Sequence, residues 1–130
     1  MGVDGSTTSW RALSMAVGVA REYGARLHAC FVLHLPGAAD VPPFGLPAAG
    51  LAPHDGGDMG RDVGDEMARA GVAGEFSCRQ GDVAVQLEQL AESCRADLIV
   101  VGRSRRPALH LGGVPRRLLS SGKRAVLVVP

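Results

Sequence analysis

The residues best suited to chemistry lie in a basic, glycine-containing segment near the carboxyl end of the chain. Arg103 and Arg105 follow Gly102, and Gly112-Gly113 ends the segment. A segment of this kind between a buried strand and a helix N-terminus can bind an anion, because backbone N–H groups and the helix dipole favour phosphate. The pattern indicates an anionic ligand.

Charge is divided unevenly along the chain. Residues 98–130 contain no Asp or Glu and carry a formal charge of +7, whereas residues 1–97 carry −6. The cations could also form a solvated face or pair with the acidic stretch 55–66, and charge alone favours this interpretation. The net charge is only +1, which argues against a nucleic-acid-binding protein, since such proteins usually carry a clear basic excess.

A second candidate contact lies at the opposite end of the chain, in Asp4-Gly5-Ser6. Asp4 can contact a ligand or cap the helix that follows, and both roles are compatible because a cap uses one carboxylate oxygen. Ser6 is better suited to capping than to binding phosphate.

No constellation of residues predicts catalysis or metal binding. Ser104 stands in Gly-Arg-Ser-Arg-Arg, which lacks the second glycine of G-x-S-x-G. His28 and His34 share a strand face, but no further metal ligand is near them in the sequence. The three cysteines are widely spaced without a C-x-x-C pair, which predicts reduced thiols in a cytoplasmic protein.

Strand and helix patterns alternate along the chain, which predicts one α/β domain over residues 1–130 with a parallel sheet. The expected strands and helices are 2–4, 7–23, 26–35, 58–70, 75–79, 83–94, 97–101, 115–121 and 125–129. Ligands bind beyond the carboxyl ends of strands in such sheets. That rule selects residues 4–6, 34–35 and 102–113.

A proline- and glycine-rich loop is expected over residues 36–57, and a loop this long is typical of a mobile or functional segment. Apolar residues make up 46% of the chain, so a globular core is expected. No apolar run approaches the ~20 residues of a membrane helix.

Several motifs together resemble the universal stress protein family. Val3-Asp4-Gly5-Ser6, with Ser9 and Ala12-Leu13, resembles the family's opening VDGSxxSxxAL. The stretch 96–102 (ADLIVVG) resembles its fourth strand, and 112–130 resembles its closing GSV…LL…PVLVVP. The resemblance covers nearly the whole chain except the loop 36–57.

The resemblance implies a three-layer, Rossmann-like sandwich of the adenine nucleotide alpha hydrolase-like type, with a five-stranded parallel sheet. It also implies a homodimer joined through strand 125–129, and ATP or another adenine nucleotide as ligand. By resemblance, Asp4 would contact the ribose side, Leu35 the adenine, and the glycine segment the phosphates. The residues implied in the site are Asp4, Gly5, Ser6, Leu35, Val101, Gly102, Arg103, Arg105, Gly112, Gly113 and Val114.

The chain departs from the family's phosphate pattern, Gly-x2-Gly-x9-Gly-Ser/Thr. Arg105 replaces the second glycine, the final pair is Gly112-Gly113 without a hydroxyl, and the spacing is shorter. A non-glycine residue adopts positive φ only at a cost, whereas Arg103 and Arg105 could supply charge-assisted contacts instead.

The first strand is also expected to be truncated, because only Met1-Gly2 precedes Val3. Two functions remain open: a non-catalytic regulatory module that binds an adenine nucleotide weakly, and a nucleotide-free structural or interaction dimer. Slow ATP hydrolysis is a weaker third alternative, since no water-positioning group is identifiable.

Overall fold

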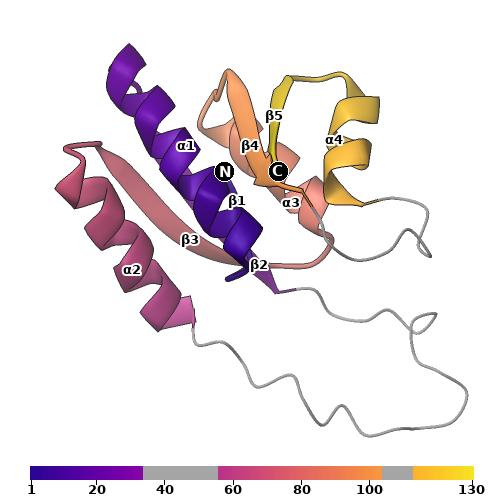
Figure 1. The fold of residues 1–130 in the computed structure, drawn as a ribbon. Coiled ribbons are helices and arrows are strands. Elements are labelled where there is room, and N and C mark those ends of the chain that lie inside the picture. Colours follow the sequence, from indigo (N-terminus) through magenta and orange to yellow (C-terminus); the bar gives the residue numbers. More distant parts are fainter. Residues whose placement is uncertain (34–55, 104–112) are drawn as a thin grey trace, which may run out of the picture.

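Strands and helices alternate in the computed structural model, which describes residues 1–33, 56–103 and 113–130 (Figure 1). The strands are β1 (Gly2–Val3), β2 (Leu27–Leu33), β3 (Gly74–Gln80), β4 (Leu98–Gly102) and β5 (Ala125–Val129). The helices are α1 (Thr7–Tyr23), α2 (Gly56–Arg69), α3 (Val83–Ser93) and α4 (Val114–Ser121). The predicted order of elements is confirmed.

The strands are parallel, but they form two hydrogen-bonded sheets instead of the single five-stranded sheet that was expected. One sheet has the order β1-β2-β3, and the other pairs β4 with β5. β1 lies beside β4, but it is only two residues long and forms no ladder with it among the described residues. The expected continuous sheet is therefore wrong at this junction, because β1 offers too few backbone groups.

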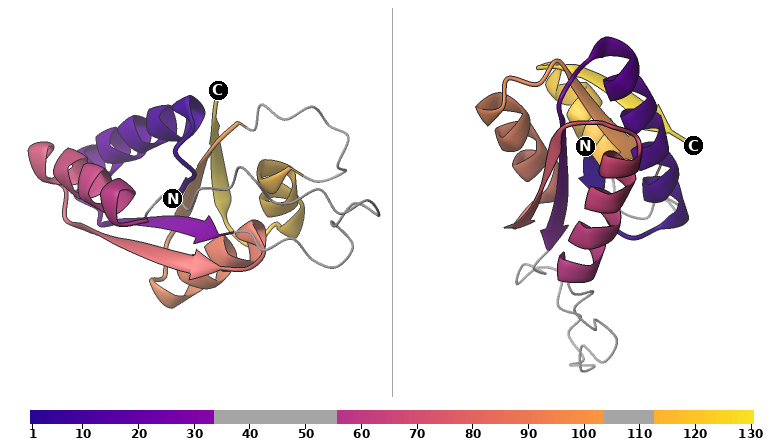
Figure 2. Two further views of the ribbon diagram at one scale, coloured as in Figure 1. Left: turned by 90° about the horizontal axis from the view of Figure 1, so that it is seen from below. Right: turned by 90° about the vertical axis from the view of Figure 1, so that its left-hand side faces the viewer.

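Helices cover both faces of the strands and produce three layers (Figure 2). One core cluster joins α1 and α2 to the strands through Leu13, Val63 and Val100. The other joins α3 and α4 to the opposite face through Leu87 and Leu118, with alternate residues of β4. Each helix thus buries one side against the strands. In the described ranges, no helix is long and apolar enough to cross a membrane.

Local capping signals fix the ends of the helices near the sheet. Ser6 caps α1 by accepting a hydrogen bond from Ser9 N at 3.2 Å, and Gly24 ends α1 in the left-handed conformation. Asp82 caps α3 by accepting from Val85 N at 3.0 Å. These caps confirm the sequence-based boundaries, because each depends on residues within one helical turn.

Several element boundaries differ from the predicted ones. α2 begins at Gly56, so the expected loop 36–57 is wrong for its last two residues, and its remainder lies outside the described residues. β2 begins at Leu27 rather than Arg26, and the predicted residues 34–35 also lie outside the described ranges. β4 extends one residue further than expected, through Gly102.

Candidate functional site

The carboxyl ends of the strands meet at one edge of the molecule, at the lower right of Figure 1. Two backbone hydrogen bonds connect neighbouring strand ends there. Gly81 N donates to Leu33 O at 3.0 Å, and Arg103 N donates to Val129 O at 2.7 Å. Arg103, the candidate residue that follows β4, therefore lies on an ordered rim.

The Asp4-Gly5-Ser6 turn links β1 to α1. Asp4 Oδ1 accepts a hydrogen bond from Ser6 N at 3.0 Å, and Asp4 N donates to Ser9 Oγ at 3.4 Å. Gly5 has a φ of +78°, which a residue with a side chain adopts only under strain. Asp4 therefore shapes the turn while Ser6 supplies the cap, and the exposed Asp4 lies at the rim.

Gly102 lies directly against the start of α1. A Cβ atom at Gly102 would come within 2.7 Å of Thr8 C and O, and within 2.9 Å of Ser9 N. The position therefore favours glycine for a structural reason, independent of any ligand, because a side chain would force the backbone of α1 to shift. The preceding Val101 is only 4% exposed and packs into the α3–α4 core cluster, so its side chain is core.

α4 begins at the same rim and presents a positive end. Its N-cap residue, Gly113, makes no side-chain capping hydrogen bond, and its first turn contains no acidic residue. Arg116 and Arg117 lie in that turn and are exposed, Arg103 is exposed at the end of β4, and Val114 is half-buried. The helix dipole and the nearby cations favour an anion here.

Leu35, Arg105 and Gly112 lie outside the described residues, and so do the predicted adenine contact and residues 104–112 of the phosphate segment. Asp4 and Gly102 are brought together through the start of α1, because Gly102 contacts Thr8 and Ser9. The start of α4, where Gly113 is the N-cap and Val114 the first residue, lies at the same edge of the fold (Figure 1).

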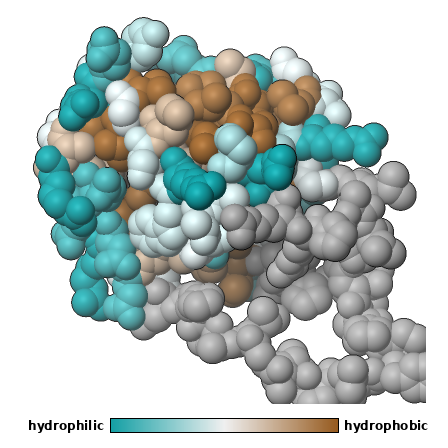
Figure 3. All heavy atoms as spheres, in the orientation of Figure 1, coloured by the Kyte–Doolittle hydropathy of each residue, from teal (hydrophilic) through white to brown (hydrophobic). Residues whose placement is uncertain are grey.

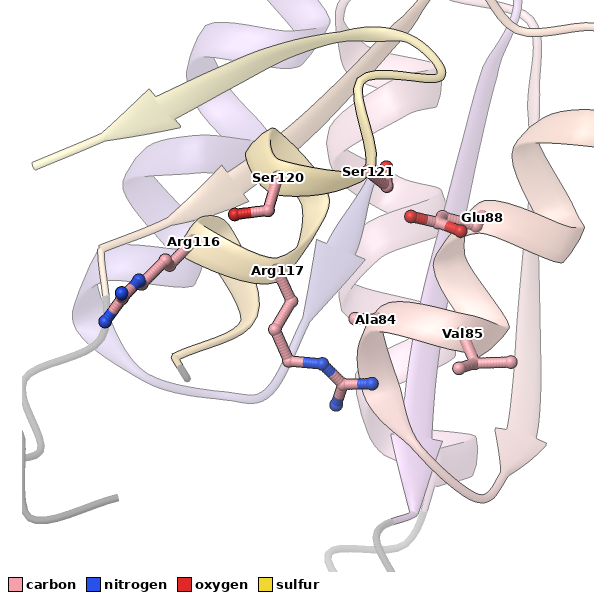
Figure 4. Close-up of a pocket in the computed structure, with 7 residues that line it drawn as sticks. All are labelled: Ala84, Val85, Glu88, Arg116, Arg117, Ser120 and Ser121. Atoms are coloured by element: carbon pink, nitrogen blue, oxygen red, sulfur yellow. The ribbon is translucent and has the colours of Figure 1, made fainter. Parts of the chain in front are cut away.

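A groove of ≈ 430 Å³ separates α3 from α4 (Figure 4). Arg117 Nη1 pairs with Asp82 Oδ2, and Lys123 Nζ pairs with Glu88 Oε2 at 3.0 Å. Hydrogen bonds from Ser121 and Lys123 lower the pKa of Glu88 below its ordinary value of 4.5. The groove is lined by Ala84, Val85, Glu88, Arg116, Arg117, Ser120 and Ser121.

These two ion pairs were missed at the sequence level. Arg117 and Lys123 pair with Asp82, the N-cap residue of α3, and with Glu88 within α3, whereas the sequence had offered the acidic stretch 55–66 as one possible set of partners. Their partners are 35 residues away in the chain, and no local pattern signals such a distance. Within the described residues, the α2 acids Asp58 and Glu66 instead pair with arginines of their own helix.

A second depression, of ≈ 570 Å³, lies beside β2, β3 and the end of α3. Glu75 there accepts a hydrogen bond from Arg26 at 3.2 Å, and its other oxygen is 3.7 Å from His28 Nδ1. The described residues hold no group of three or more His, Cys, Asp or Glu side chains that could bind a metal.

The three cysteines are free thiols. Cys30 is fully buried, and burial raises the pKa of its thiol despite a hydrogen bond with Ser77 that lowers it. Cys78 is exposed, and Cys94 is half-buried. A thiol with a raised pKa is a poor nucleophile, so Cys30 acts as a packing residue.

Comparisons with known proteins identify the family. The family model described as universal stress protein family matches residues 1–130. A universal stress protein of Methanocaldococcus jannaschii is 32% identical over 97% of this chain and 77% of its own length. A universal stress family protein from Burkholderia pseudomallei is 30% identical, with a TM-score of 0.76 over 99% of this chain and 92% of that one. A universal stress protein in complex with cAMP is 27% identical, with a TM-score of 0.75 and the same coverage of both chains. The chain belongs to the universal stress protein family.

Proposed function

We propose that this protein is a non-catalytic regulatory module that binds an adenine nucleotide weakly at the carboxyl edge of its sheet. The observation that carries the proposal is the meeting of two features at one edge. The exposed turn at Asp4 follows β1, and the arginine-bearing start of α4, whose N-cap Gly113 makes no side-chain capping hydrogen bond, lies at the same edge. The similar protein in complex with cAMP supports an adenine nucleotide as the class of ligand.

The two features suit different parts of a nucleotide. The Asp4 carboxylate can accept hydrogen bonds from ribose hydroxyls, because an ionised carboxylate only accepts. The N–H groups at the start of α4 and the exposed Arg103 side chain can donate to phosphate oxygens. Gly102 supports this arrangement indirectly, since it allows β4 to end against the start of α1.

Binding without turnover is part of the proposal. Among the described residues no cluster suited to a metal occurs, and Asp4 is engaged in the turn before α1. Hydrolysis of a nucleotide would need a group that positions water and a second group that stabilises the leaving phosphate. The cytoplasm is the proposed location, where adenine nucleotides are abundant and the three free thiols stay reduced.

Thermal unfolding with and without millimolar Mg-ATP tests the proposed function, with AMP and cAMP in parallel. A ligand that binds only the folded state stabilises it by ~2.7 kcal/mol at one hundred times its dissociation constant. We expect all three nucleotides to raise the melting temperature. An unchanged melting temperature with every nucleotide would contradict the proposal and leave the nucleotide-free dimer.

Substitution of the arginines tests how the phosphates are held. Arg103→Ala and Arg105→Ala should each weaken ATP binding by roughly 1.5–3 kcal/mol, the contribution of one charge-assisted hydrogen bond. Arg21→Ala, at the far end of α1, is the matched control for loss of one positive charge. Unchanged ATP affinity in both variants would show that arginines do not replace the missing loop glycine.

The second candidate function is a nucleotide-free structural or interaction dimer. β5 is an edge strand without a charged residue, and it pairs only with β4 among the described strands. Apolar residues gather along α1 and toward the β4–β5 edge (Figure 3). An apolar edge strand tends to pair with another strand, so homodimerisation through residues 125–129 is proposed for either function.

A further inference from the structure

Arg117 connects the start of α4 to the start of α3. Its backbone N–H donates to Gly113 O at 3.2 Å, which closes the first turn of α4. Its guanidinium donates to Asp82 Oδ2 across the groove (Figure 4 shows the side chain directed toward α3). Arg117 therefore links the proposed phosphate-binding end of α4 to a neighbouring helix.

Asp82 is itself held firmly by the surrounding structure. Its other carboxylate oxygen, Oδ1, accepts from Val85 N at 3.0 Å and caps α3. The preceding Gly81 donates its N–H to Leu33 O at 3.0 Å, which ties the start of α3 to the end of β2. Asp82 thus offers Arg117 a fixed anchor on the rim of the sheet.

A second ion pair joins the same two regions further along α4. Lys123, just after the helix, pairs with Glu88 in the middle of α3 at 3.0 Å. Both pairs join residues 35 positions apart, and each has one partner, Arg117 or Glu88, in the lining of the groove. Only the Arg117–Asp82 pair lies in the first turn of α4, where Gly113 and Val114 lie.

We infer that Arg117 and Asp82 are positioning residues of the nucleotide site. Their ion pair fixes the first turn of α4, so that the N–H groups of Gly113, Val114 and Arg116 face the phosphates in the bound geometry; Pro115 has no N–H, and that of Arg117 is bonded to Gly113 O. Holding the site in this geometry raises affinity, because the ligand no longer has to order the turn when it binds. This inference rests on the proposed function, since it concerns the same site.

The direction in which Asp82→Asn changes nucleotide affinity separates a positioning role of Arg117 from direct contact with phosphate. If Arg117 bound phosphate directly, Asp82→Asn would release the guanidinium and strengthen nucleotide binding. If Arg117 acts through its pair, Asp82→Asn weakens binding, because the first turn of α4 loses its anchor. Asparagine caps helices as well as aspartate does, so α3 keeps its cap in this variant.

The test is calorimetric titration of the full-length protein with AMP and ATP. Arg117→Gln and Asp82→Asn should each weaken binding by about two- to fivefold, the range expected for one solvent-exposed ion pair. The double variant should bind no more weakly than either single variant, because both substitutions remove the same pair. Arg117→Lys, which keeps the positive charge, should retain most of the nucleotide affinity that Arg117→Gln loses.

Glu88→Gln and Lys123→Gln are the matched controls, since they remove an ion pair between the same two regions and change the charge identically. We expect both to leave nucleotide affinity at the wild-type value, although they lower the melting temperature. Equal losses of affinity in the two sets of variants would overturn the inference and indicate only general destabilisation. Stronger binding by Asp82→Asn would overturn it in favour of direct phosphate contact.

Hydrogen exchange without ligand supplies a second readout. Arg117→Gln should speed hydrogen exchange at the backbone amides of residues 117 and 118, compared with the rates at the same amides in Lys123→Gln. If Arg117→Gln and Asp82→Asn both kept wild-type exchange rates at these amides, the inference would be overturned while the proposed function stayed intact. Absence of nucleotide binding by the wild-type protein would instead overturn the proposed function, and the inference with it.

Discussion

At the scale of single residues, Gly102 is constrained by what surrounds it and not by its backbone angles. Its φ lies outside the left-handed region, yet a Cβ would come within 2.7 Å of the Thr8 backbone. Gly5 shows the opposite case, with a φ of +78°, while a Cβ added there would meet only the Met59 methyl, at 3.3 Å. The same residue type is therefore required for two different physical reasons around one site.

Gly102→Ala should destabilise the fold by about 1–3 kcal/mol, the usual effect of overpacking, because the backbone of α1 has to move. Denaturant unfolding measures the loss. Gly18→Ala, at an exposed position in α1 where no atom lies within 4 Å of the new Cβ, is the control and should be at least as stable as the wild type. Equal stabilities of Gly102→Ala and the wild type would show that the close approach is relaxed in solution.

Glu88 makes stability depend on pH at the acid end. Its pKa is lowered in the folded state, so its contribution is complete above the ordinary value of 4.5 and is lost as the pH falls through the lowered pKa. We expect Glu88→Gln to be less stable than the wild type at pH 7, with the difference vanishing in acid. Chemical unfolding at pH 7, 5, 4 and 3 measures it.

Glu92→Gln, on the exposed side of the same helix, is the control for loss of one negative charge. A stability difference between Glu88→Gln and the wild type that stays constant from pH 7 to pH 3 would contradict the assignment of the hydrogen bonds from Ser121 and Lys123.

At the scale of elements, α2 contains glycines with unequal roles. Gly60 packs against the Phe76 ring of β3, where a Cβ would come within 2.8 Å of Cδ1. Gly64 has nothing within 4 Å of that position. Helix propensity predicts that both glycines weaken α2. Only at Gly64 is this loss of helix stability without a compensating contact. Gly60 allows the helix to approach the sheet.

Gly64→Ala should therefore stabilise the protein by about 0.5–1 kcal/mol, through the lower backbone entropy of alanine in the unfolded chain. Gly60→Ala should lose this gain, because the Phe76 ring has to shift. Melting temperatures of the two variants provide the comparison. A Gly60→Ala variant as stable as Gly64→Ala would mean that the contact with β3 is loose.

At the scale of the whole molecule, two of the edge strands, β3 in one sheet and β5 in the other, differ in charge. β3 carries Glu75 and Arg79, whereas β5 carries only apolar residues. Charged residues on an edge strand discourage pairing with another chain, and their absence permits it. Self-association is therefore expected at β5 and not at β3.

Ala125→Lys, at the exposed start of β5, should weaken the dimer by about fivefold or more, because the added charge is desolvated or repelled at the interface. Sedimentation over a concentration series measures the dissociation constant. Gln80→Lys, at the exposed end of β3, is the matched control and should leave it unchanged. A monomeric wild-type protein at every concentration would contradict pairing through β5.

The sequence by itself determined the order of the elements, the caps at Ser6 and Asp82, and the family, because these depend on neighbouring residues and on motif order. Tertiary structure decided what depends on distant contacts. It divided the strands into two sheets at the short β1, assigned the close packing of Gly102 to α1, and paired Arg117 with Asp82. Charge counting had left open whether the basic residues form a solvated face or pair with the acidic stretch 55–66, since a sequence records how many charges exist but not which of them the fold brings within reach.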